Sequence, residues 1–185
     1  RGAVGKLAAG RDVLNCFCYT GGFSLYAARA GATSVLSIDS SAEALRLAAE
    51  NAERNELATG SMEWREADVF TALRKFRDER RTFDMIILDP PKFAATSAQV
   101  ERASRAYKDI NLLALKLLRP GGILATFSCS GGIDAGLFQK IIAGAAQDAN
   151  VEAQIVSRLG QAGDHPVSIH FPEGTYLKGL ILRKQ

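Results

Sequence analysis

One cysteine in this chain of 185 residues stands where catalytic groups are often found. Cys129 lies in the stretch FSCSGG, between Ser128 and Ser130, at the end of an apolar run that is typical of a β-strand. A thiolate is a strong nucleophile when its surroundings favour ionisation. A single cysteine at the end of a buried strand is also often a small packing residue. The local sequence leaves both interpretations open.

The stretch DPPKF carries a second set of reactive groups and begins at Asp89, directly after the apolar run FDMIIL. Pro90 and Pro91 fix the backbone φ angle and lack N–H donors, so the chain leaves the strand extended and presents the acid to a cleft. Lys92 and Phe93 add a cation and an aromatic ring, which suit a phosphate and a nucleobase. A rigid loop without function is the alternative, but two prolines beside an acid favour a functional site.

Two further acids and a pair of glycines follow other apolar runs. Gly21 and Gly22 come after DVLNCF, and they allow a positive φ and close approach of a ligand to the backbone. Asp39 ends SVLSID, where a carboxylate can accept hydrogen bonds from the hydroxyls of a ribose or cap a helix. Asp68 follows SMEWREA and could accept from an adenine amino group or cap the next helix. Because GxGxxG is missing, the pattern predicts an adenosine without a pyrophosphate, as in S-adenosylmethionine.

Short apolar runs alternate with longer amphipathic ones, which indicates a parallel sheet covered by helices on both faces. The expected strands are residues 12–17, 34–39, 61–67, 83–89, 122–130, 152–159 and 176–183, and the expected helices are 22–30, 41–55, 69–77, 99–118 and 134–149. The last two strands have no helical pattern between them and should pair antiparallel. We therefore predict one α/β domain over residues 1–185, with a doubly wound, mostly parallel seven-stranded sheet. Ligands bind such sheets at the carboxyl ends of the strands, which would gather the residues above.

Composition narrows the classes of protein. With 47% hydrophobic residues the chain can bury one full core, and a net charge of +3 is too small to indicate nucleic-acid binding by itself. Three cysteines without CxxC spacing suggest neither disulfides nor a metal site, so a reducing cytoplasm is expected. No apolar stretch reaches the roughly 20 residues of a membrane span. Because the chain starts at Arg1 without a methionine, we expect a fragment of a longer protein.

Several stretches together resemble class I S-adenosylmethionine-dependent methyltransferases: LNCFCYTGGFSLYAARAGA, SIDSS, DPPKF, SCS, GQAGDHPV and PEGTYLKGL. The resemblance is closer to the catalytic domain of the bacterial 23S ribosomal RNA 5-methylcytosine methyltransferases that carry an N-terminal PUA domain. It implies a Rossmann-like fold, S-adenosylmethionine as cofactor, ribosomal RNA as partner and an RNA-binding region before Arg1, and it leaves a homodimer open. The implied cofactor residues are Tyr19, Thr20, Gly21, Phe23, Asp39, Ser40, Asp68, Val69 and Asp89. The implied substrate residues are Pro90, Pro91, Lys92 and Phe93.

The resemblance also assigns chemistry to Cys129. Cytosine C5 is a poor nucleophile, and a thiolate that adds at C6 gives C5 the enamine character needed for methylation. The resemblance makes Cys129 this nucleophile, and Asp89 could hydrogen-bond the cytosine edge and favour protonation at N3. The base that removes the C5 proton is not identified by these motifs. His165, in GDHPVS, is either a site residue or an ordinary loop histidine.

Three other functions compete with this one. An amine N-methyltransferase would use DPP followed by an aromatic residue, but Lys92 holds that position and Cys129 would have no role. A nicotinamide-dependent oxidoreductase is disfavoured by the missing GxGxxG, and the third alternative is a cofactor-binding module without activity. A strip of basic residues could contact RNA, or it could be a solvated helix face. The strip consists of Lys92, Arg102, Arg105 and Lys108.

Overall fold

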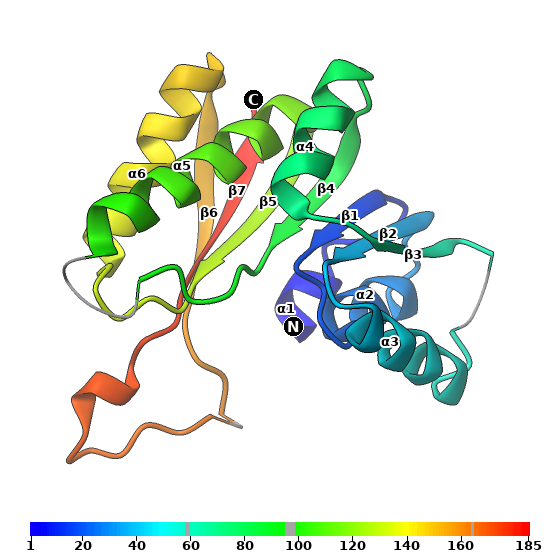
Figure 1. The fold of residues 1–185 in the computed structure, drawn as a ribbon, viewed down its shortest axis with the longest axis horizontal. Helices are drawn as coiled ribbons and strands as arrows, with labels where there is room; N and C mark the ends of the chain where they lie inside the picture. The colour runs from blue at the N-terminus through cyan, green and yellow to red at the C-terminus, as the bar shows by residue number, and fades with distance from the viewer. Residues whose placement is uncertain (58–59, 95–98, 164) are drawn as a thin grey trace.

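A seven-stranded sheet runs through the centre of the molecule (Figure 1). The computed structural model describes residues 1–57, 60–94, 99–163 and 165–185. The strands are β1 (Asp12–Cys16), β2 (Ser34–Asp39), β3 (Met62–Glu66), β4 (Phe83–Leu88), β5 (Leu118–Ser128), β6 (Ala153–Leu159) and β7 (Lys178–Lys184). Their order in the sheet is β3-β2-β1-β4-β5-β7-β6, and only β7 runs antiparallel to its neighbours β5 and β6. The predicted fold class and the antiparallel final pair are confirmed.

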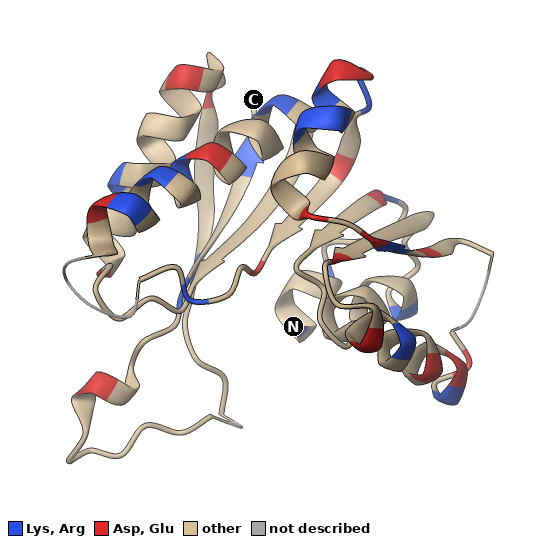
Figure 2. Ribbon diagram, viewed as in Figure 1, with Lys and Arg blue, Asp and Glu red and all other residues tan. Residues whose placement is uncertain are grey.

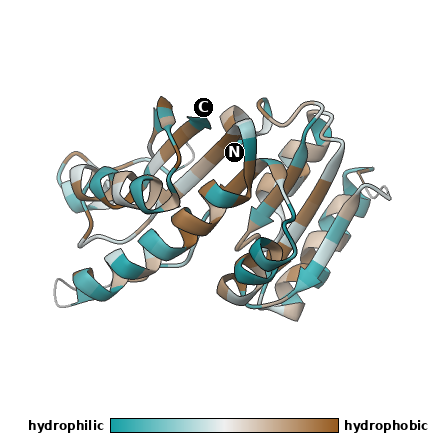
Figure 3. Cartoon of the chain, turned by 90° about the horizontal axis from the view of Figure 1, so that it is seen from above, coloured by the Kyte–Doolittle hydropathy of each residue, from teal (hydrophilic) through white to brown (hydrophobic). Residues whose placement is uncertain are grey.

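Helices cover both faces of this sheet. They are α1 (Gly2–Gly5), α2 (Gly22–Arg29), α3 (Ala42–Arg54), α4 (Val69–Asp78), α5 (Val100–Leu117) and α6 (Ala135–Ala149). One hydrophobic cluster joins α4, α5 and α6 to the sheet, and a second cluster joins α1 and α2 to its other face. Figure 3 shows hydrophobic colour concentrated on the strands, with hydrophilic colour on the outer turns of the helices. Burial of apolar area on both faces holds the strands in register.

The largest departure from the predicted elements lies between α5 and β5. A helix to residue 118 and a strand from 122 were expected, because RPGG contains two strong breakers of regular structure. Instead β5 starts at Leu118, which pairs with Phe83, and the register shifts before Ile123 pairs with Met85. Gly121, with φ of 74°, allows this irregular stretch. Strand β5 therefore pairs with β4 from Phe83 onward and ends at Ser128, directly before Cys129.

The segment between β6 and β7 extends away from the sheet and is called the β6–β7 arm here (Figure 1). Its described residues are 160–163 and 165–177, and they include one 3-10 turn, η2 (Pro172–Gly174). Several large apolar side chains of the arm are exposed, Ile169 by 90% and Phe171 by 59%. Among the described residues, no helix combines the length and apolar character needed to cross a bilayer.

Candidate functional site

A cavity of about 470 Å³ opens at the carboxyl ends of β4 and β5, beside the base of the β6–β7 arm. Asp89, Cys129 and Phe23 line it, so the acid of DPPKF, the cysteine of SCS and an aromatic residue of α2 meet in one place. The arm contributes Gln161, His165 and Tyr176. His165 therefore lies in the lining of the site. The sequence alone left that point open.

The turn after β1 is held by the carboxylate that ends β2. Phe17 and Tyr19 have left-handed φ angles of 59° and 49°, which cost a non-glycine residue about 1 kcal/mol or more each. The Tyr19 N–H donates to Asp39 Oδ2 at 2.8 Å, and the Ser41 N–H donates to Asp39 Oδ1 at 3.0 Å. Asp39 thus links the turn after β1 to the residues that follow β2. Each of its oxygens can accept a further hydrogen bond, so the backbone anchor and a ribose contact are compatible.

Gly21 occupies a position that only glycine fits well. It caps α2 with φ of 82°, and an added Cβ would lie 2.9 Å from the Trp64 ring and 3.0 Å from the Cβ of Ala48. The carbonyl of Thr20 next to it accepts a hydrogen bond from Asn51 of α3 at 3.2 Å. Gly22, by contrast, is the first residue of α2 and has no positive φ. The expectation of a positive φ at both glycines is therefore wrong for Gly22.

Gly21→Ala is expected to weaken both folding and cofactor binding. The left-handed backbone costs alanine about 1–2 kcal/mol, and Trp64 must also shift. Trp64 is the single tryptophan of the chain, so its fluorescence reports on this turn in urea unfolding and in titration with S-adenosylhomocysteine. Gly163→Ala is the control, because its Cβ would meet nothing within 4 Å. If Gly21→Ala and Gly163→Ala had equal effects, the assignment of Gly21 to the cofactor site would be contradicted.

Asp68 and Ser41 act as helix caps. Asp68 Oδ1 accepts from the N–H and the hydroxyl of Thr71 at the start of α4, at 2.8 and 2.7 Å. Ser41 Oγ caps α3 by accepting from the Ala44 N–H at 3.2 Å. Val69, the first residue of α4, is buried in the core, so only its backbone could face a ligand. For Asp68 the capping alternative is realised, and its carboxylate lies outside the lining of the Cys129 cavity.

The loop after β4 places an acid in the cavity. Burial raises the pKa of Asp89, and the positive charge of Arg1 opposes this shift. The carboxyl group therefore keeps its proton to a higher pH than an exposed aspartate does. Pro90 behind it is buried, whereas Pro91 and Lys92 are exposed. Lys92 is thus accessible to a charged substrate.

Phe93, the last residue of DPPKF, packs among other aromatic rings. Its ring packs 4.8 Å from Tyr107, 6.0 Å from Phe70 and 6.4 Å from Phe17, measured between centroids. Phe93 does not line the cavity and packs against the main hydrophobic cluster. Contacts between aromatic rings of the core hold it in place. That Phe93 also offers its face to a nucleobase stays a prediction.

Cys129 follows β5 at the mouth of the cavity and is partly exposed. Its Sγ lies 3.9 Å from the carbonyl oxygen of Pro90. Burial raises the pKa of Cys129, and the negative charge of Asp89 raises it further, whereas Lys178 and Lys92 lower it. Two cations therefore favour the thiolate against these effects. The other two cysteines, at positions 16 and 18, are buried and their pKa values are raised mainly by burial.

Lys178→Met is expected to move the ionisation of Cys129 to higher pH. The Lys178 ammonium favours the thiolate, so removing its charge raises the pKa of Cys129. Alkylation of Cys129 by iodoacetamide, followed by peptide mass spectrometry, should then be slower at neutral pH and recover only at higher pH. Lys140→Met on α6 is the control, because Lys140 is not among the charges that shift this thiol. An unchanged pH profile would contradict the electrostatic role of Lys178.

Sequence reasoning missed two residues that hold the SCS segment. Lys178 Nζ donates to the carbonyl of Ser130 at 2.7 Å, and the hydroxyl of Tyr107 lies 3.1 Å from Ser130 Oγ. Lys178 could have been found from the antiparallel register, which sets it opposite Ser128. Tyr107 could have been noticed as a polar tip on the buried face of the helix over 99–118.

Helix α5, which carries Arg102, Arg105 and Lys108 of the basic strip, bears charges of both signs (Figure 2). Arg105 pairs with Glu101 at 3.1 Å, and Lys108 pairs with Asp148 of α6 at 2.8 Å. These exposed ion pairs fit the solvated helix face that the sequence left as the alternative. Lys92 remains the member of the strip that belongs to the loop after β4.

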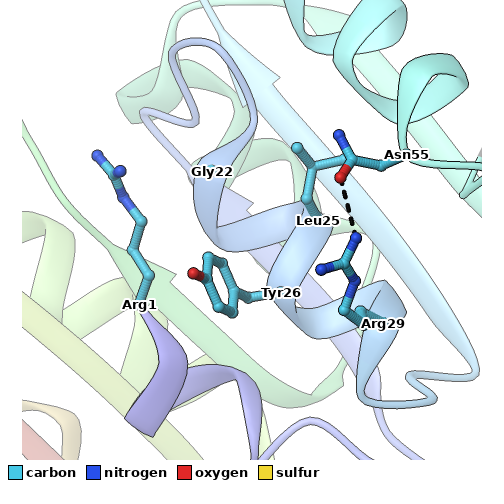
Figure 4. A pocket seen from close by; sticks show the side chains of 6 residues that line it. All are labelled: Arg1, Gly22, Leu25, Tyr26, Arg29 and Asn55. Atoms are coloured by element: carbon cyan, nitrogen blue, oxygen red, sulfur yellow. Dashed lines mark hydrogen bonds between the residues drawn. The ribbon is translucent and has the colours of Figure 1, made fainter.

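A smaller pocket of about 170 Å³ lies against α2 (Figure 4). Tyr26 and Leu25 line it, and Arg29 donates to Asn55 across it at 2.9 Å. None of the expected catalytic or substrate residues is in this lining. The larger cavity with Cys129 and Asp89 is therefore the candidate active site.

A doubly wound sheet of this strand order, with acids and a glycine turn at its carboxyl edge, defines a Rossmann-like methyltransferase. The family model for S-adenosylmethionine-dependent methyltransferases matches residues 1–182, and the chain belongs to this family.

Two curated relatives are both called Ribosomal RNA large subunit methyltransferase I. The one from Shewanella amazonensis is 56% identical and the one from Shewanella denitrificans is 55% identical, each over 183 residues. Each match covers 99% of this chain and 46% of the relative, so the chain spans about half the length of these proteins. The solved structure of SMU.776 complexed with SAH superposes with a TM-score of 0.85 at 26% identity, and it covers 97% of this chain and 47% of that one. S-adenosylmethionine is thus the cofactor of the family.

Proposed function

We propose that this protein methylates C5 of a cytosine in 23S ribosomal RNA. The observation that carries the proposal is the meeting of Cys129 and Asp89 in one cavity, with the thiol beside the Pro90 carbonyl. Methylation of this carbon needs a nucleophile that activates the ring, whereas an exocyclic amine needs none. The names of the relatives support ribosomal RNA as the substrate.

The ends of β1 and β2 fit an adenosine. When bound, S-adenosylmethionine supplies an electrophilic methyl group. Asp39 keeps acceptor capacity on both oxygens, and the first N–H groups of α2 point out of the helix without intrahelical partners. The residues that would hold the cofactor are Tyr19, Thr20, Gly21, Phe23, Asp39 and Ser40, with Asp68 and Val69 at the adenine end and Asp89 near the methyl group.

Cys129 and Asp89 can activate the ring for methylation. The Cys129 thiolate uses one electron pair to form an S–C6 bond, and the electrons of the C5=C6 bond move toward N3. Asp89 donates its proton to N3, which its raised pKa favours. C5 then has enamine character and can accept the methyl group. A base takes up the C5 proton, the electrons of the C5–H bond restore the C5=C6 bond and expel the Cys129 thiolate from C6, and N3 returns its proton to Asp89.

The substrate enters over the loop after β4. Pro91 and Lys92 are exposed there, and we expect the Lys92 ammonium to meet a phosphate of the RNA. Pro90 is buried behind them and offers its carbonyl to the thiol. We place the reaction in the cytoplasm, where bacterial ribosomal RNA is made and modified.

The product decides between this proposal and an amine methyltransferase. The protein at its natural length is incubated with unmodified 23S ribosomal RNA and methyl-deuterated S-adenosylmethionine, and the digested nucleosides are analysed by mass spectrometry. Labelled 5-methylcytidine is the expected product. A labelled nucleoside with a methylated amine would overturn the proposal. RNA from a strain that already carries the modification is the matched control and should accept no label.

A further inference from the structure

Ser130, directly after Cys129, joins three separate parts of the chain. Its Oγ accepts a hydrogen bond from the Ala94 N–H at 3.1 Å and lies 3.1 Å from the hydroxyl of Tyr107. Its carbonyl accepts from Lys178 Nζ at 2.7 Å. The loop after β4, helix α5 and strand β7 therefore converge on one fully buried residue next to the thiol.

These hydroxyls lie outside the cavity. Side chains alternate across a strand, so Ser128 points to the opposite face of β5 from Phe127 and Cys129. Phe127 and Cys129 line the cavity, whereas Ser128, Ser130 and Tyr107 are fully buried and do not. The hydroxyl pair of Ser130 and Tyr107 thus supports the thiol from the core side and cannot touch a substrate.

Tyr107 is held in place by the core around it. Its side chain is buried on α5, and its ring packs 4.8 Å from Phe93 and 5.7 Å from Phe138. Burying a hydroxyl in such surroundings is costly unless it is hydrogen-bonded. Phenylalanine and alanine would fill similar volumes without that cost. The hydrogen bond between the hydroxyls of Tyr107 and Ser130 offsets that cost and links α5 to the segment after β5.

We propose that Tyr107 and Ser130 are positioning residues that hold Cys129 against the Pro90 carbonyl. The inference rests on the proposed function in that Cys129 is taken to be the nucleophile. The Ala94 N–H and the Ser130 hydroxyl fasten the loop that carries Asp89 to the segment that carries the thiol. Reacting groups must be held closely, because a displacement of about 1 Å can lower a rate by roughly 100-fold.

Three variants test this inference, and each removes one buried hydroxyl. Ser130→Ala and Tyr107→Phe break the proposed support. Thr126→Val is the matched control: Thr126 is fully buried on β5, on the same face as Ser128, and its hydroxyl has no hydrogen-bond partner in the described part of the chain. The measurements are kcat and KM on ribosomal RNA, affinity for S-adenosylhomocysteine, thermal unfolding, and the alkylation rate of Cys129.

Positioning predicts a specific combination of results. Ser130→Ala should lower kcat about 100-fold and Tyr107→Phe about 10-fold, with KM and cofactor affinity unchanged. Alkylation of Cys129 by iodoacetamide should become faster in both, because the partly exposed thiol is no longer held against Pro90. Thr126→Val should match the unmodified protein in kcat and alkylation.

Two results would overturn the inference. One is a kcat of Ser130→Ala that equals the kcat of Thr126→Val. The other is a fall in kcat accompanied by an equal fall in cofactor affinity and unchanged alkylation, which would mean a general structural role. Failure of the proposed function looks different, because the methylated product would then form without Cys129. In that case the alkylation rates of Ser130→Ala and Thr126→Val still decide whether the hydroxyl pair holds the thiol.

Discussion

Cys129→Ala is expected to lower the rate of methyl transfer to ribosomal RNA by about 1,000-fold or more, because Cys129 is the single thiol among the described residues that line the cavity. Cysteines 16 and 18 cannot replace it, since both are buried and outside the lining of the cavity. Affinity for S-adenosylhomocysteine should be unchanged, because the assigned cofactor residues do not include Cys129. Nucleoside mass spectrometry and calorimetric titration measure the two effects.

RNA containing 5-fluorocytidine gives this prediction a direct readout. Fluorine at C5 leaves no proton to remove, so the S–C6 bond should persist and shift the protein band on a denaturing gel. The unmodified protein should show the shifted band and Cys129→Ala should not. Cys18→Ala is the matched control, because it removes a thiol that does not line the cavity, and it should still form the adduct. Methylation at a normal rate by Cys129→Ala would return this cysteine to a packing role.

Asp89→Asn is expected to change two rates in opposite directions. Methyl transfer should fall about 100-fold or more, because asparagine cannot donate a proton to N3. Alkylation of Cys129 should become faster at a given pH, because Asp89 is one of the groups that raise the pKa of this thiol. Burial remains the largest cause of the raised pKa, so Cys129 should still ionise at higher pH than an exposed cysteine. Rates of alkylation over a pH series measure the shift.

The control for Asp89→Asn comes from the same strand. Asp84 lies on β4 near its other end and pairs with Arg119 at 2.8 Å, so Asp84→Asn removes a carboxylate far along the strand from the thiol. That variant should lose some thermal stability and keep the alkylation rate of Cys129. If Asp84→Asn and Asp89→Asn changed alkylation alike, the local electrostatic account would be wrong.

Most of the sheet could be predicted because its strands are short apolar runs bounded by turn residues. Helix α1 was not predicted, since GAVG is too short and too rich in glycine to be helical alone. It forms because Val4 is buried against the cluster that also holds residues of α2. The start of β5 was predicted too late for a similar reason. Pairing of Leu118 with Phe83 overrides the breakers Pro120 and Gly121.

The site was predictable where a motif fixes the backbone, and less so where side chains choose between partners. Asp89 and Cys129 follow adjacent parallel strands, so their meeting follows from the topology. The helix cap at Asp68 depends on Thr71, which the pattern does not weigh. The place of Phe93 depends on Tyr107 of α5, fourteen residues further along the chain. Such contacts emerge only from packing in three dimensions.

The reversed direction of β7 has a practical consequence for labelling. Strand β7 begins at Lys178, at the end of the sheet that holds the cavity. It runs toward the opposite end of the strands and finishes at Lys184. Seven residues of extended chain span roughly 20 Å. A fluorophore or surface tether attached at position 185 would therefore sit about that far from Cys129 and leave the mouth of the cavity open.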